Sequence, residues 1–242
     1  MISATLAFFA LAAGVGHAQD RVILRDNRVE TGRVTGVRNG NVMEAVAAGE
    51  KGLPLNIVAS VEMPEPPGLA TARAALRAGE AASAIGSLRP VVEQFKGLPA
   101  PWAEEATGLL GEAYIAGKDL PKAAAAFAEF RKLYPGGRNS ARAEVGIAEL
   151  DLVNKKTASA RTRLDPIADA ALKAKSVTAQ DGAVYGKVFV LLGRIHEAEG
   201  RYPEALESYL RTVTLFHHDP AAAKDAQKRA DALRKSRSVM VP

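Results

Sequence analysis

Hydrophobic positions recur with a helical period along most of the chain. From Gly68 onward, alanine, leucine and valine are spaced three and four residues apart, as in helices that bury one face. Glycine, proline and short polar clusters interrupt this pattern at regular intervals. The sequence therefore predicts eight or nine helices. The interruptions lie near residues 79, 96–101, 118–119, 135–139, 155–157, 176–182, 200–201 and 218–219.

A different pattern precedes the helices, between residues 21 and 64. Short runs rich in β-branched residues are separated by turn residues such as Asn39-Gly40. Alternate positions from Val29 to Val37 would share one face of a strand. We expect five short antiparallel strands that curl into a small barrel-like module. The expected strands are 22–24, 29–37, 41–46, 55–59 and a short piece at Val61, with residues 49–52 in a turn.

The first eighteen residues contain no Lys, Arg, Asp or Glu, and almost all of residues 2–16 are small or apolar. This composition is typical of the core of a secretory signal peptide, although the usual basic start is missing. The alternatives are a buried helix or an uncleaved anchor, but the apolar run is shorter than the roughly 20 residues that span a bilayer. Because Gly16 and Ala18 are small, we expect cleavage after Ala18. The mature chain is then expected to be periplasmic and to have no transmembrane segment.

A proline-rich stretch, Met63-Pro64-Glu65-Pro66-Pro67, separates the two patterns. Proline donates no hydrogen bond to a sheet and restricts the residue before it, so strand pairing ends here. The predicted organisation has five parts. They are a signal peptide at 1–18, a β module at 19–63, a linker at 64–67, a helical repeat domain at 68–236 and a flexible C-terminal tail at 237–242.

Composition narrows the possible functions. The 32 basic residues exceed the 27 acidic ones only slightly, which is typical of a solvated surface and not of the clustered charge that nucleic acid or anionic lipid requires. Cysteine is absent, so disulfides, thiolate metal ligands and thiol nucleophiles are excluded. Aromatic residues make up only 5% of the chain while alanine is abundant, and this balance favours closely packed helices.

Two stretches of the helical region align with each other. They are LLGEAYIAGKDLPKAAAAFAEFRKLYP and LLGRIHEAEGRYPEALESYLRTVTLFH, and both resemble the helix–turn–helix pattern of tetratricopeptide repeats. The resemblance implies an α-solenoid of antiparallel helix pairs. It also implies packing roles, not chemical ones, at the signature positions, although His196 replaces the first aromatic of the second stretch. These positions are Leu110, Gly111, Tyr114, Ala123, Phe127 and Pro135 in the first stretch and Leu192, Gly193, Tyr202, Ala205 and Tyr209 in the second.

Two less regular repeats are expected around Ala84 and around Gly146. The segment from Asp219 onward has an N-cap followed by proline and an alanine stripe, as a polar-backed capping helix requires. Its basic side chains either complement the helix dipole or contact an acidic partner. They are Lys224, Lys228, Arg229, Arg234 and Lys235.

The run ILRDNRVETGRVTGVRNGNV resembles the opening of small SH3-like or Sm-like barrels. Sm-like barrels can bind RNA, but this segment carries charges of both signs and follows an export signal. We therefore favour an adaptor module over an RNA site.

The tetratricopeptide resemblance further implies a concave groove lined by the first helix of each repeat. Lys187 and Arg194 are seven residues apart and hence on one helix face. They could hold an acidic side chain or a C-terminal carboxylate, or they could form an exposed basic pair. The family-equivalent inward positions are Glu105, Glu112, Ile115, Ile147, Lys187, Arg194 and Glu197.

The sequence offers little material for catalysis. Of four histidines, His17 lies in the expected signal peptide and His196 occupies a packing position, while the adjacent His217 and His218 point about 100° apart on a helix. Carboxylates such as Glu104 are interpreted as parts of solvated helix faces. No nucleophile elbow, P-loop, H-E-x-x-H or dinucleotide motif is present. We expect no catalytic residue, metal or cofactor.

These observations favour a non-enzymatic scaffold of the cell envelope that binds other proteins or peptides in the groove. The alternative is a binder of nucleic acid or another anionic polymer through the β module and the basic C-terminal helix.

Overall fold

The computed structural model describes residues 19–237, so the expected signal peptide and most of the expected tail lie outside the described residues. The described chain begins with an antiparallel five-stranded sheet, and its first three strands lie where the sequence predicts them. The strand expected at 55–59 is wrong for residues 55–57, which form a 3₁₀ turn, and the last strand runs from Val58 to Glu62. Its strand order is β4-β3-β2-β1-β5, and no ladder joins β4 to β5 among residues 19–237. The strands are β1 (Asp20–Leu24), β2 (Val29–Arg38), β3 (Asn41–Val46), β4 (Gly49–Pro54) and β5 (Val58–Glu62), with a 3₁₀ turn at Leu55–Ile57.

Strand β4 corrects the expected turn at residues 49–52. Its sequence, GEKGLP, contains two glycines and a proline, which are unfavourable in strands. The strand forms because β3 provides a complete partner, with Asn41 opposite Pro54 and Val46 opposite Gly49. Proline is tolerated because it ends an edge strand. Cross-strand pairing therefore overrides local propensity at this edge.

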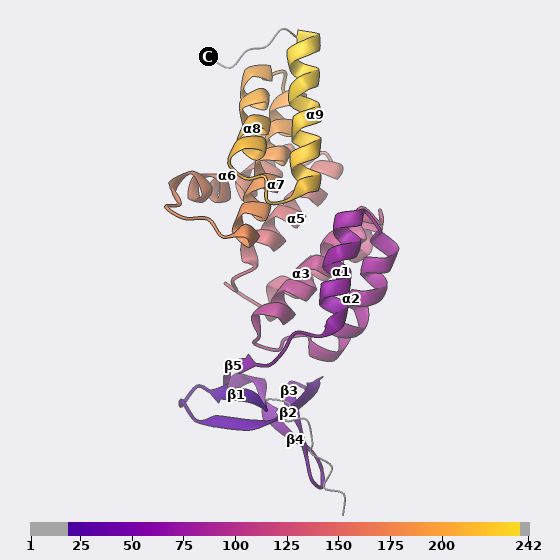
Figure 1. Cartoon of the computed structure of the whole chain (residues 1–242), viewed down its shortest axis with the longest axis vertical. Helices are drawn as coiled ribbons and strands as arrows, with labels where there is room; N and C mark the ends of the chain where they lie inside the picture. Colours follow the sequence, from indigo (N-terminus) through magenta and orange to yellow (C-terminus); the bar gives the residue numbers. More distant parts are fainter. Residues whose placement is uncertain (1–18, 238–242) are drawn as a thin grey trace, which may run out of the picture.

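The remaining described residues form nine helices, the upper of the two numbers expected (Figure 1). Helices α1–α8 make four antiparallel pairs, and α9 packs beside α7 and α8 at the end of the stack. The fold is thus an α-solenoid preceded by a small β module. The helices are α1 (Pro67–Ala78), α2 (Ala81–Phe95), α3 (Pro101–Ala116), α4 (Leu120–Leu133), α5 (Ser140–Val153), α6 (Thr157–Lys173), α7 (Ala179–Ala198), α8 (Tyr202–Thr214) and α9 (Pro220–Arg237).

Close packing within the repeats depends on glycine. A Cβ atom built on Gly111 of α3 would lie 2.6 Å from the Phe127 ring, and one on Gly146 of α5 would lie 2.1 Å from the same ring. The tip of the Phe127 side chain therefore lies between these two helices. Gly193 stands in the same relation to Tyr209, at 2.4 Å. The side chains of Phe127 and Tyr209 are almost completely buried.

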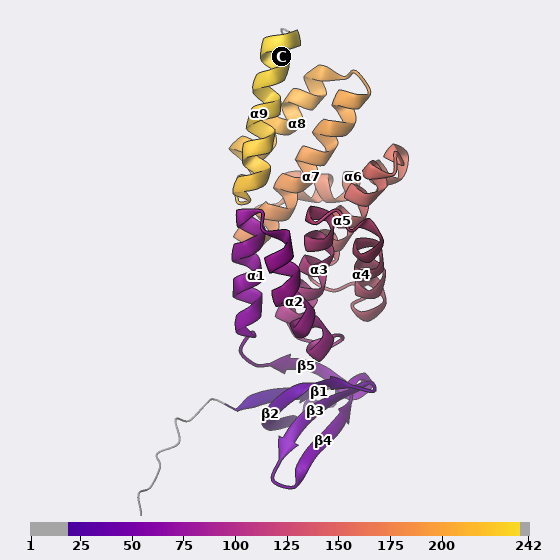
Figure 2. The same cartoon turned by 90° about the vertical axis from the view of Figure 1, so that its right-hand side faces the viewer.

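The β module and the first helices share one hydrophobic core. The cluster extends from Val22 and Val61 of the sheet to Leu69, Phe95 and Trp102 of the helices. Figure 2 shows the sheet directly against the ends of α1, α2 and α3. A continuous core of this kind makes the module an integral part of the stack.

Backbone contacts reinforce this junction. The Gln94 side chain of α2 donates a hydrogen bond of 2.7 Å to the Thr35 carbonyl of β2, and the Val61 N–H of β5 donates to the Pro99 carbonyl. Gly36 has a φ of +149°, and a Cβ atom there would lie 2.7 Å from the Gln94 carbonyl oxygen. Glycine at this position therefore permits the close approach of α2 to the bent strand β2.

Candidate partner-binding cleft

The inward faces of α1, α3, α5 and α7, together with the start of α9, enclose a cleft of about 420 Å³. The first helix of each pair supplies one strip of the wall. The N-terminal part of α9 contributes Pro220, Ala221, Ala222 and Asp225 to the lining. The wall combines aliphatic side chains, among them Leu76, Leu109, Val190 and Leu191, with charged ones from every helix.

Four of the seven residues expected in the groove line this cleft. They are Glu105, Glu112, Lys187 and Arg194.

The other three expected groove residues lie elsewhere. Ile115 and Ile147 pack, partly buried, against the cluster that contains Phe127 and Phe130. Glu197 accepts hydrogen bonds from the Tyr209 hydroxyl at 2.8 Å and from Arg229 at 3.3 Å. The prediction is wrong for the two isoleucines because these side chains point toward α4, where they complete an aliphatic and aromatic core.

Ion pairs connect each inward helix to the next. Arg73 of α1 pairs with Glu105 of α3 at 2.7 Å, and Glu112 of α3 pairs with Arg142 of α5 at 2.9 Å. We call the set of these pairs, with those of Lys187 and Arg194 described next, the ion-pair ladder. Its members come from helices far apart in sequence, so it holds the superhelix together along its inner face.

Lys187 and Arg194 complete the ladder. The Lys187 ammonium lies 3.0 Å from Glu149 and 3.8 Å from Glu112, while Arg194 contacts Asp225 of α9 at 2.6 Å. Neither of the two sequence-based alternatives describes this pair, because both cations already have acidic partners within the chain. The superhelical path that joins α5, α7 and α9 creates these partners.

The ladder changes the protonation behaviour of its members. Burial by itself would raise the pKa of Glu112, but the charges of Arg142 and Lys187 and the Arg142 hydrogen bond bring it below the ordinary value. Burial opposes the charged form of Lys187 as well, yet Glu112 and Glu149 raise the pKa of this ammonium. Both groups are therefore charged at neutral pH.

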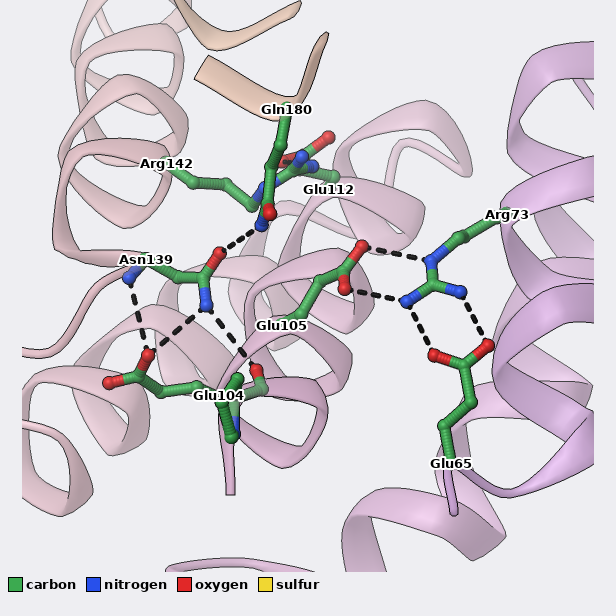
Figure 3. Close-up of polar contacts among 9 residues, drawn as sticks. Glu65, Arg73, Glu104, Glu105, Glu112, Asn139, Arg142 and Gln180 are labelled. Atoms are coloured by element: carbon green, nitrogen blue, oxygen red, sulfur yellow. Dashed lines mark hydrogen bonds and ion pairs between the residues drawn. The ribbon is translucent and has the colours of Figure 1, made fainter. Parts of the chain in front are cut away.

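Arg73 joins the cleft to the β-module linker. Its guanidinium makes two hydrogen bonds to Glu65, at 2.7 and 2.9 Å, and two to Glu105, at 2.9 and 2.7 Å (Figure 3). These bonds to Glu105 and Glu65 raise the pKa of Arg73 above its ordinary value. The Arg73 side chain thus connects Glu65 of the linker to Glu105 at the rim of the cleft.

A second polar chain runs through the starts of α3, α5 and α7. Gln180 donates to Asn139 at 2.8 Å, and the Asn139 side chain donates to the Glu104 carboxylate at 3.1 Å (Figure 3). Glu104 is only 8% exposed, which corrects its interpretation as part of a solvated face. The three residues fix the relative positions of successive inward helices.

Several charged side chains that line the cleft are not among the residues expected from the sequence. Their helical spacing was a usable signal, because 105, 109, 112 and 116 form one stripe on α3, and 142, 145 and 149 form one on α5. The tetratricopeptide resemblance places Ile147 in the groove, whereas Glu149 lines the cleft in the structure. The missed residues are Arg73, Arg142, Glu149 and Asp225.

The histidines have structural surroundings. His196 lies 3.3 Å from the hydroxyl of Ser208 and 3.3 Å from Arg161, and burial together with the charge of Arg201 lowers its pKa. The rings of His217 and His218 stack on each other. Within the described part of the chain, no group of three or more histidine and acidic residues has the geometry of a metal site.

Charges of the β module are largely paired within it. Arg28 contacts Asp26 at 2.7 Å, Arg38 contacts Glu50 at 3.0 Å and Lys51 contacts Glu30 at 2.6 Å. A surface that binds nucleic acid leaves clustered cations free for phosphates. The module thus gives no support to the nucleic-acid alternative. In the part of the chain that the structure describes, no helix has the length and apolarity needed to cross a bilayer.

Comparison with known families agrees with the fold. A family model described as tetratricopeptide repeat matches residues 69–138, which span the first two helix pairs. No curated protein matches the chain in sequence. Repeats of this family generally mediate protein–protein interactions and are generally non-catalytic.

Proposed function

We propose that this chain is a non-enzymatic scaffold of the cell envelope that binds segments of partner proteins in its cleft. The observation that carries the proposal is a cleft of about 420 Å³ to which all four inward helices contribute. Tetratricopeptide repeats generally bind proteins or peptides, which supports this choice of surface. A rigid concave wall with aliphatic and polar groups suits an extended or helical segment.

The envelope location is the second part of the proposal. It rests on the apolar run within residues 2–16 and on the small residues before Gln19. Determination of the N-terminus of the protein from intact cells by mass spectrometry tests it. A start at Gln19 is the expected result, and an intact Met1 contradicts export.

Photo-crosslinking in intact cells tests the cleft itself. A benzophenone amino acid at Ala183, which lines the cleft, is expected to capture envelope proteins. The matched control places the same group at Lys132, an exposed position of α4 outside the lining of the cleft. Equal capture at both positions contradicts binding in the cleft, and recovery of nucleic acid with the chain instead supports the alternative function.

A further inference from the structure

The cleft continues into a second hollow at the C-terminal ends of α5 and α7. This hollow has a volume of about 430 Å³ and shares Glu149, Leu191 and Arg194 with the main cleft. Its other walls include the aliphatic side chains of Leu152, Val153 and Ile195. The inner face of the solenoid therefore has a charged part and an apolar part side by side.

The charged part does not favour a strongly charged partner. Glu105, Glu112, Lys187 and Arg194 all have oppositely charged partners in the ladder. An acidic or basic partner segment would have to separate one of these pairs, and breaking a largely buried pair is costly. Arg77 at the end of α1 and Lys155 beside the hollow are exposed and have no ion pair among residues 19–237, so they add a positive charge at either end. Along the ladder between them, charge complementarity points to an uncharged region of the partner.

The apolar part offers surface that α5 and α7 leave open. Val153 is 52% exposed although it borders the hollow, and Leu152 beside it is only half-buried. A cavity of about 150 Å³ is large enough for a benzene-sized group, so the hollow has room for one large side chain. Covering these aliphatic groups would remove apolar surface from water.

Arg194 marks the boundary between the two parts. One of its terminal nitrogens donates to Asp225 at 2.6 Å, but its buried Nε has no hydrogen-bond partner among residues 19–237. A buried donor without an acceptor is unfavourable. The carbonyl of a peptide that crosses this boundary would supply an acceptor after a small rotation of the guanidinium.

We propose that the hollow is an anchor pocket for one large aliphatic or aromatic side chain of a partner segment bound in the cleft. The proposal rests on the proposed function and specifies the partner: an uncharged segment with one apolar anchor. Because apolar burial and not charge supplies the affinity, binding is expected to depend only weakly on salt.

The experiment uses a random dodecapeptide phage library selected against the purified full chain, followed by fluorescence anisotropy with the selected peptides. We expect the peptides to share one large apolar residue, and its replacement by alanine to weaken binding about tenfold or more. Val153→Asp is expected to weaken binding to the same degree. The matched control, Leu172→Asp, changes a residue that is 48% exposed on α6, and it is expected to leave binding within about twofold.

Two further outcomes separate the inference from the proposed function. Ala183→Trp fills the main cleft, so binding that survives it, or a library that yields no binder, contradicts the proposed function. Loss of binding with Ala183→Trp but not with Val153→Asp overturns only the anchor pocket. Peptides selected for acidic clusters, with steep salt dependence, also overturn it. Circular dichroism verifies that each variant is folded.

Discussion

At the scale of single residues, small side chains determine whether the helices fit together. Gly111 and Gly146 stand on either side of the Phe127 ring, and Gly193 faces Tyr209. These are positions where a methyl group has no room. Gly86 of α2 is also helical, but a Cβ atom there would meet nothing within 4 Å apart from its chain neighbours and the nearby backbone of its own helix. Glycine is thus needed for packing at residues 111, 146 and 193, whereas at residue 86 it only lowers the stability of the helix.

Gly111→Ala is expected to destabilise the protein by about 1–3 kcal/mol, because the added methyl group would overpack the core against Phe127. Gly86→Ala is the control and should raise stability by about 0.5–1 kcal/mol, since alanine is the better helix former. Urea denaturation followed by circular dichroism measures both. Equal effects of the two substitutions would contradict the close packing at Gly111.

Glu44 is a second residue with a specific energetic role. Its side chain is buried in the β module, and its Oε1 has no hydrogen-bond partner among the residues described. Burial raises the pKa of Glu44, while Lys51 lowers it and Glu30 and Asp20 raise it. A carboxyl whose pKa is raised by folding binds more protons in the native state. Its contribution to stability is therefore full below the ordinary pKa of 4.5 and is lost as pH rises through the folded pKa.

Glu44→Gln is expected to increase stability relative to the wild type as pH rises from about 4.5 to 7, because glutamine is never ionised. The measurement is the urea midpoint of both proteins at several pH values. Glu80→Gln, at an exposed carboxyl with no ion pair among residues 19–237, serves as the control for a general charge effect. A difference between wild type and Glu44→Gln that stays constant with pH would count against this role.

At the scale of elements, the ion-pair ladder connects the inward helices. Glu112 is central because it contacts Arg142 of α5 and approaches Lys187 of α7. Removal of its charge leaves Arg142 with Glu105 and Asp219 as acidic neighbours, and Lys187 with Glu149. The lowered pKa of Glu112 means that its contribution is present above the ordinary pKa of 4.5 and is lost as pH falls through the folded pKa.

Glu112→Gln is therefore expected to destabilise the protein by about 2–3 kcal/mol at pH 7, and by progressively less below about pH 4.5. The exposed pair of Arg89 and Glu93, 3.4 Å apart on α2, provides the control. Glu93→Gln should cost no more than about 0.5 kcal/mol. Chemical denaturation at pH 7 and at pH 4 distinguishes the two, and similar effects at both sites would rule out a special role of the ladder.

Sequence patterns predict the helices and strands themselves better than they predict the contacts between them. Proline and glycine positions identified the helix boundaries because they act through the local backbone, as at Pro101 and Gly79. Strand β4 was missed because its pairing with β3 is not encoded in its own composition. The partners of Lys187 were missed for a related reason: Glu149 and Glu112 reach it only through the path of the whole superhelix.

At the scale of the whole molecule, the shared core couples the β module to the solenoid. Val22 of β1 is completely buried and belongs to the same cluster as Trp102 of α3. Trp102 is the single tryptophan of the chain, so its fluorescence reports on the helical side of the junction. A destabilising substitution in the sheet is therefore expected to change the unfolding midpoint that Trp102 fluorescence reports.

Val22→Ala is expected to lower the stability reported by Trp102 by about 2 kcal/mol, because it removes two buried methyl groups from the common core. Val29→Ala changes a valine that is 44% exposed on β2, and it should have an effect within about 0.5 kcal/mol. Fluorescence and circular dichroism are recorded during the same urea titration. An unchanged Trp102 midpoint in Val22→Ala would mean that the module unfolds independently.

The position of the Phe127 ring has a consequence for molecular recognition. A side chain of α4 acts as a spacer between α3 and α5, so the local pitch of the superhelix is fixed by the size of one ring. Pitch determines how far apart the contact points for a partner lie along the inner wall. A wall with a fixed repeat distance favours partner segments whose contacting residues have the same spacing. It needs little conformational reorganisation when such a segment binds.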